Sequence, residues 1–172
     1  VPFTQKKDAA GNGAGAESPG GAAVRLGISS CLLGQAVRYD GNHKSDAYIL
    51  GTLAKVFDFV SFCPEVAIGM GVPRPPIRLT GDSNNPEAVG VDDPALNVTD
   101  SLRRFGRDAA RKLTDVSGFI FKNRSPSCGV SRVKVYQKSG PPKVGGVGLF
   151  AREIIDAHPL LPVEDEGRLT DP

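Results

Sequence analysis

The chain has 172 residues, of which 40% are hydrophobic and 23% are charged, and its formal net charge at pH 7 is +2. This length suits one well-packed domain, and the composition is that of an ordinary soluble protein. The small net charge gives no support for binding to nucleic acid or to a membrane surface, and no apolar run approaches the roughly 20 residues that a membrane span needs.

The first 23 residues are rich in Gly and Ala and show no apolar periodicity. We expect them to form a flexible leader or an expression remnant, followed by a single catalytic domain over residues 24–172. They contain no continuous apolar stretch of the kind found in a secretory signal. We therefore expect a cytoplasmic protein.

Three short apolar segments, at residues 25–29, 58–62 and 118–122, have the character of buried β-strands. The segments between and after these strands are predicted to form helices. Strands that alternate with helices predict an α/β fold, a single domain with a mainly parallel sheet flanked by helices. The stretch from residue 70 to residue 94 is rich in Pro, Gly, Asn and Asp, so we expect a long irregular excursion there.

Three helices are predicted. Ser45 is expected to cap the first, which runs to about Val56. The second spans about residues 99–113 and carries apolar side chains on one face and arginines on the other. The third spans about residues 148–157 and ends ahead of Pro159, which cannot continue a helix.

The chain contains three cysteines, Cys31, Cys63 and Cys128. An odd number fits poorly with a disulfide framework, and three separate buried thiols are the plain alternative. However, each cysteine lies shortly after the C-terminal end of a predicted strand. The carboxyl ends of parallel strands meet at one edge of a sheet, where ligands bind, so we expect the three cysteines to converge.

The residues around the cysteines suit an iron–sulfur cluster. Small residues offer backbone N–H groups to sulfur, and basic residues can offset the negative charge of a cluster, although plain surface charge is an equal alternative for each of them. The basic residues of these loops are Arg38, Lys44, Arg74, Lys122 and Arg124.

Three thiolates leave one ligand of a four-iron cluster missing, because such a cluster normally takes four cysteines. An open position is typical of catalytic metal sites. Zinc bound by three cysteines and a water is a rival, although the chain has no close C-x₂₋₄-C pair of the structural zinc type.

Three separated motifs resemble the DUF523 family, whose best-understood members are thiouracil desulfidases. The motifs, in chain order, are SSCLLGQAVRYDGNHK at 29–44, CPEVAIGMGVPRPPIRL at 63–79 and NRSPSCG at 123–129. The later segments GVGLFAREI and LPVEDEGRL extend the resemblance, which spans about residues 25–169. One difference is visible at Asn42, where a second Gly is expected after Gly41.

The resemblance implies a 4Fe-4S cluster that Cys31, Cys63 and Cys128 hold, with one open iron. It also implies a desulfidase that removes sulfur from a small thiolated pyrimidine of the thiouracil or thiouridine type. The expected reaction is a non-redox hydrolytic cleavage of the C–S bond that releases sulfide. Soft thiocarbonyl sulfur suits iron in a thiolate cluster, and its binding prepares the carbon for attack by water.

Glu65, two residues after Cys63, is the leading candidate for the acid–base group of this reaction. An ion pair with Arg74, or a helix cap, is its alternative role. Asp40 is a second candidate carboxylate, for which a role in a turn is equally open. Ser125 is the third candidate catalytic residue. The candidate substrate-binding residues are Lys122, Ser127, Ser30 and Arg74.

Two other functions remain open from the sequence. One is an iron–sulfur hydratase or dehydratase, in which Arg74, Arg78 and Arg124 would grip a carboxylate substrate. The other is a non-enzymatic metal-binding sensor module. Neither a membrane nor a nucleic acid is an expected partner, and the sequence does not specify the oligomeric state.

Overall fold

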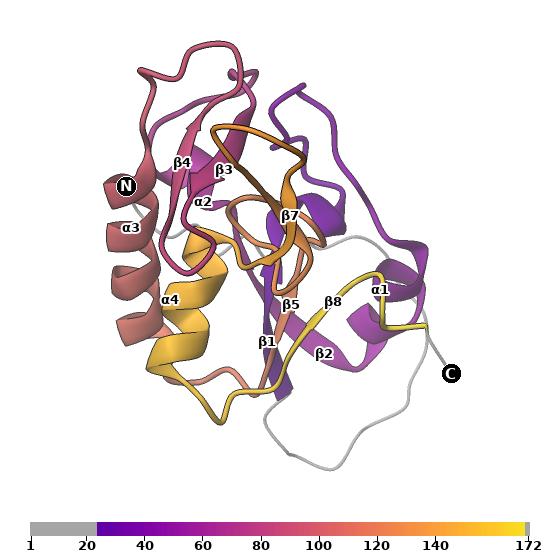
Figure 1. Ribbon diagram of the computed structural model, residues 1–172. Coiled ribbons are helices and arrows are strands. Elements are labelled where there is room, and N and C mark those ends of the chain that lie inside the picture. Colours follow the sequence, from indigo (N-terminus) through magenta and orange to yellow (C-terminus); the bar gives the residue numbers. More distant parts are fainter. Residues whose placement is uncertain (1–23, 171–172) are drawn as a thin grey trace, which may run out of the picture.

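Two four-stranded β-sheets form the framework of the computed structural model, which describes residues 24–170 (Figure 1). Helices flank both sheets, so the predicted single α/β domain is confirmed, with two sheets in place of one. The leader expected over residues 1–23 lies outside the described residues.

Sheet A is parallel, and its strand order is β2-β1-β5-β8. The strands are β1 (Val24–Ser29), β2 (Phe57–Phe62), β5 (Phe119–Phe121) and β8 (Val163–Asp165). The first three match the predicted strands to within one residue at each end. Gly27 allows β1 to lie close to β5, because a Cβ at this position would come within 2.3 Å of the Phe119 ring.

Sheet B is mixed, and its strand order is β4-β3-β6-β7. The strands are β3 (Ile77–Gly81), β4 (Pro86–Gly90), β6 (Val133–Tyr136) and β7 (Lys143–Gly146). The irregular excursion predicted for residues 70–94 is therefore wrong, since β3 and β4 pair there as an antiparallel hairpin. In β3 only Ile77 and Leu79 are buried, so the strand offers just two alternating buried positions. Such a short pattern is hard to recognise among the flanking Pro, Gly and Asn residues.

The longer helices match their predictions to within one residue. They are α3 (Thr99–Lys112) and α4 (Leu149–Ala157).

The helix predicted from a Ser45 cap to about Val56 is wrong in its capping residue and in its length. Helix α1 (Ala47–Gly51) begins after Asp46, whose carboxylate accepts from the backbone N–H of Ile49 at 2.9 Å, and a short 3₁₀ helix (Leu53–Lys55) follows it. Gly51 and Thr52 are poor helix formers, which explains the break.

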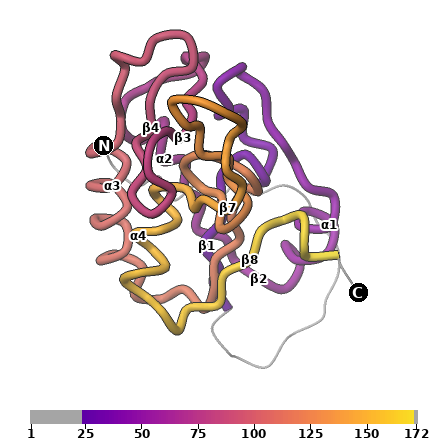
Figure 2. Tube along the Cα trace, viewed as in Figure 1, coloured from indigo at the N-terminus to yellow at the C-terminus, as the bar shows by residue number. Residues whose placement is uncertain are grey.

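Helices cover both faces of sheet A. Figure 1 shows α3 and α4 side by side on one side of the sheet and α1 on the other, and the tube in Figure 2 follows the same path. Rings of Phe62, Phe119 and Phe121 pack against Phe150 of α4, while Ile49 of α1 packs with the opposite face. This packing fixes the carboxyl ends of β2, β1 and β5. Within residues 24–170, none of the helices has the length and apolar character that a membrane crossing requires.

Candidate active site

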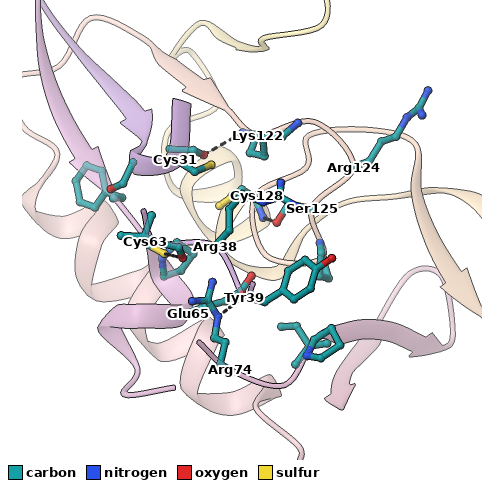
Figure 3. Close-up of a pocket in the computed structure, with 18 of the residues that line it drawn as sticks. Cys31, Arg38, Tyr39, Cys63, Glu65, Arg74, Lys122, Arg124, Ser125 and Cys128 are labelled. Carbon is teal, nitrogen blue, oxygen red and sulfur yellow. Dashed lines mark hydrogen bonds and ion pairs between the residues drawn. The ribbon is translucent and has the colours of Figure 1, made fainter. Parts of the chain in front are cut away.

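The three cysteines line one pocket at the carboxyl edge of sheet A (Figure 3). The pocket has a volume of about 310 Å³. Cys31 follows β1, Cys63 follows β2 directly, and Cys128 lies in the loop after β5. Because β2, β1 and β5 are neighbouring parallel strands, their carboxyl ends lie side by side. The strand order therefore brings together the cysteines that the sequence separates.

The loop that carries Cys31 is a short 3₁₀ helix (Ser30–Leu33) that Gly34 ends in a left-handed conformation, with φ of 81°. The carbonyl oxygen of Cys31 accepts from the backbone N–H of Lys44 at 3.0 Å. At the end of β1, the hydroxyl oxygen of Ser29 accepts from the backbone N–H of Lys122 at 2.9 Å. This last bond ties the Cys31 loop to the segment that leads to Cys128.

The loop that carries Cys128 is held by the start of α4. The backbone N–H of Leu149 donates to Pro126, and those of Phe150 and Ala151 donate to Ser127, at 3.0 to 3.1 Å. The unpaired N–H groups of a helix N-terminus thus find carbonyl partners in this loop. Inside the loop, the Ser125 hydroxyl oxygen accepts from the backbone N–H of Cys128 at 3.1 Å. The position of Cys128 is fixed on both sides.

Glu65 lies between these loops, on the first turn of the short helix α2 (Pro64–Ala67) that starts directly after Cys63. One carboxylate oxygen accepts from Nε of Arg74 at 2.8 Å, and the other accepts from the hydroxyl of Ser127, also at 2.8 Å. Figure 3 shows Glu65 and Arg74 below the cysteines. The ion pair with Arg74 that the sequence left open for Glu65 is therefore present.

Of the other candidate residues, Ser30, Arg74, Lys122 and Ser125 line the pocket. Lys122 forms an ion pair with Glu166 and donates to the carbonyl oxygen of Asn123 at 3.2 Å. An ammonium group has three donors, so Lys122 keeps one for a ligand.

Two candidates lie outside the pocket lining. Ser127 is fully buried, and its hydroxyl donates to Glu65. Asp40 lies in a turn, where its carboxylate accepts from the backbone N–H of Asn42 at 3.1 Å and pairs with Arg38 at 3.5 Å. The bond from Asn42 lowers the pKa of Asp40, and Arg38 adds to this effect. Asp40 thus has the turn contacts that the sequence left open as its alternative.

The cysteine thiols are poorly solvated. Burial raises the pKa of Cys31 to about 11, although Lys122 opposes the shift. Burial also raises the pKa of Cys63, and it raises that of Cys128 well above the ordinary value. The Cys63 thiol donates to the carbonyl oxygen of Val37 at 3.6 Å. A bound metal is the usual means by which such buried thiols lose their protons.

The sequence did not assign Tyr39 to the site, although its side chain lines the pocket and is 43% exposed. The guanidinium of Arg38 lies 5.5 Å from the centre of the Tyr39 ring. In Figure 3 the ring lies across the pocket from the cysteines. One feature of the sequence could have identified Tyr39, namely an aromatic residue among polar residues in the loop that follows Cys31.

The chemistry of the donor set suits an iron–sulfur cluster. The three thiols that line the pocket are soft donors, which suit iron–sulfur clusters and zinc alike. Structural zinc sites usually use close C-x₂₋₄-C pairs, which the sequence lacks. The residues present therefore fit an iron–sulfur group.

The model of a family described as 2-thiouracil desulfurase matches residues 26–166. The uncharacterized protein YbbK of Bacillus subtilis (strain 168) is 32% identical over 133 residues, which are 72% of this chain and 85% of that protein.

A solved structure of the thiouracil desulfidase TudS, described as 4Fe-4S-dependent, superposes with a TM-score of 0.66 at 29% identity. The superposition covers 85% of this chain and 93% of that chain. The two molecules therefore share their fold along most of their length.

Proposed function

This chain belongs to the 2-thiouracil desulfurase family, whose model matches residues 26–166, and we propose that it removes sulfur from thiolated pyrimidines as sulfide. The observation that carries the proposal is the convergence of all three cysteines of the chain on one pocket that Glu65 also lines. The alternative of three unrelated core thiols does not account for this arrangement.

We propose that Cys31, Cys63 and Cys128 hold a 4Fe-4S cluster and leave one iron without a protein ligand. The solved relative named as 4Fe-4S-dependent supports this assignment. When bound, the cluster supplies a soft Lewis acid that takes the thiocarbonyl sulfur and withdraws electrons from its carbon. Lys122 and Arg38, which line the same pocket, place positive charge near the negative group.

The residues of the pocket supply the proton transfers. Water adds its oxygen to the carbon, the C–S bond breaks, and the products are a C=O group and sulfide, with no net oxidation or reduction. Both oxygens of Glu65 already accept a hydrogen bond, but each keeps a further lone pair for a proton from water. We propose that Glu65 takes this proton and delivers it to the leaving sulfur. The second hydrogen of the water is released as the C=O group forms, so both hydrogens leave with the sulfide and the ring nitrogens keep their own. The Ser125 hydroxyl keeps its own proton for a substrate oxygen.

The size of the substrate is suggested by a second hollow of about 600 Å³, which shares Ile77, Arg124 and Pro126 with the pocket. Its other basic residues are Arg78, Arg132 and Lys134. Among the described residues, the buried Nε of Arg78 has no hydrogen-bond partner. An anionic group would satisfy it, so we propose that the enzyme accepts a nucleotide as well as a free base.

The direct test is an anaerobic assay of protein reconstituted with iron and sulfide. The substrates are 2-thiouracil, 4-thiouracil and 4-thiouridine 5′-phosphate, and the readouts are the loss of thione absorbance and the release of sulfide. We expect equal amounts of both from holoprotein and neither from apoprotein. Thione loss that does not depend on the cluster would exclude the mechanism, and turnover of hydroxy acids alone would indicate a dehydratase.

Tyr39 is expected to hold the pyrimidine ring by stacking. Replacing Tyr39 by Leu should raise KM about fivefold and change kcat little, because an aromatic pair contributes about 1 kcal/mol beyond its buried area. Tyr39→Phe keeps the ring and is the matched control, with KM close to that of the wild type. Equal KM values for the Leu and Phe variants, at equal iron content, would show that the ring does not contact substrate.

A further inference from the structure

We infer that Ser127 and Arg74 are positioning residues that hold Glu65 in place and, through it, fix the Cys63 loop against the Cys128 loop. We call the three side chains the carboxylate tie. The inference rests on the proposed function for the role of Glu65, but the part that concerns the loops does not depend on which substrate is used.

The contacts of the tie are short and largely shielded from water. Ser127 is fully buried, and the side chains of Arg74 and Glu65 are 3% and 14% exposed. Arg74 is itself held, because its Nη1 donates to the carbonyl oxygen of Gly71 at 3.0 Å and its backbone N–H donates to Tyr39 at 2.9 Å. Hydrogen bonds to a charged group are stronger than neutral ones, and they strengthen further away from water. Each oxygen of the Glu65 carboxylate therefore accepts a hydrogen bond from a donor whose own position is fixed.

The position of the tie along the chain gives it a second effect. Ser127 is the neighbour of Cys128, and Glu65 follows Cys63 by two residues. The strands that lead to these cysteines, β2 and β5, do not pair with each other, because β1 lies between them. The bond between Glu65 and Ser127 thus crosses the end of β1 and links two cysteine loops that the sheet connects only through a third strand.

The hydroxyl of Ser127 can be removed without loss of the loop. The loop backbone is anchored separately, since the carbonyl oxygen of Ser127 accepts from Phe150 and Ala151 at the start of α4. Ser127→Ala therefore deletes one half of the tie and keeps these backbone bonds. Ser83→Ala is a matched control, because the Ser83 hydroxyl is buried outside the pocket and has no hydrogen-bond partner among the described residues.

The test uses the reconstituted holoprotein under anaerobic conditions. The first readout is the rate of iron release to an excess of chelator, and the second is the division of any activity loss between kcat and KM. For Ser127→Ala we expect iron release about tenfold faster and kcat about tenfold lower, with KM nearly unchanged. A merely structural role would not lower kcat at full iron loading. Ser83→Ala should match the wild type in both readouts.

Arg74 provides an independent variant that remains informative if Ser127→Ala does not fold. Arg74→Lys keeps the positive charge, so it should retain more kcat and hold iron longer than Arg74→Gln. Wild-type iron release and kcat in Ser127→Ala, or equal behaviour of the two Arg74 variants, would overturn the inference. A wild-type protein that binds iron but does not convert thiolated pyrimidines would contradict the proposed function alone, and iron release would still test the loop linkage.

Discussion

Replacing any one of the three cysteines by alanine should remove most of the bound iron and reduce desulfidase activity to the background of the assay. The reason is the size of the donor set, since the chain has no fourth cysteine that can take the vacant place. A cluster that already lacks one protein ligand is left with two. The measurement is iron and sulfide content after anaerobic reconstitution, together with the visible absorbance of the cluster.

Cys128→Ala is the most informative of the three variants. Cys128 packs in the same apolar group as Phe62, Phe119 and Phe150, where alanine replaces the thiol with little change in volume. We therefore expect the variant apoprotein to unfold at a temperature close to that of the wild-type apoprotein. A Cys128→Ala protein that still carries four irons would show that this thiol is not a ligand. Zinc in place of iron in fresh wild-type protein would contradict the cluster itself.

The convergence of the cysteines was predictable because it depends on local strand signals and one general rule. The strands that precede Cys31, Cys63 and Cys128 are short and apolar, so their composition reveals them. The rule that parallel strands end at a common edge then supplies the rest. The candidate position of Glu65 followed from its place two residues after Cys63.

The sequence offered one of the partners, Arg74, as an alternative role of Glu65, and Arg74 does pair with Glu65 from the segment before β3. The other partners were not predictable, because they come from distant parts of the chain. Glu166 pairs with Lys122 because β8 lies beside β5, and a strand of three residues leaves too weak a pattern to be recognised. Sheet B was missed for a related reason, since its strands are short and partly exposed.

These partners change how the acid–base role of Glu65 must be tested. Alanine at this position would remove the carboxylate and also leave the buried donors of Arg74 and Ser127 without a partner. Loss of activity in Glu65→Ala would then have two explanations, a missing proton acceptor or a disturbed pair of cysteine loops. Glutamine separates them better, because it keeps the size of the side chain and one acceptor oxygen for the tie.

Glu65→Gln should lower kcat by about 10² to 10⁴, which is the usual contribution of a positioned acid–base group. Because the amide oxygen can still accept from Ser127, iron content should stay near that of the wild type. The amide nitrogen cannot accept the second bond from Arg74, so we expect iron release to quicken only modestly. The measurements are kcat with a thiolated pyrimidine and iron per chain in the same sample.

The matched control is Glu153→Gln, which breaks the ion pair between Glu153 and Arg107 at 3.3 Å, away from the pocket. It changes the net charge by the same amount and should leave kcat and iron content unaltered. If Glu65→Gln keeps wild-type kcat at full iron loading, proton transfer belongs to another group, and Ser125 is the next residue of the pocket to replace. If kcat falls while iron stays, the carboxylate acts on the substrate as well as on the loops, and the same side chain joins the chemistry of the site to its assembly.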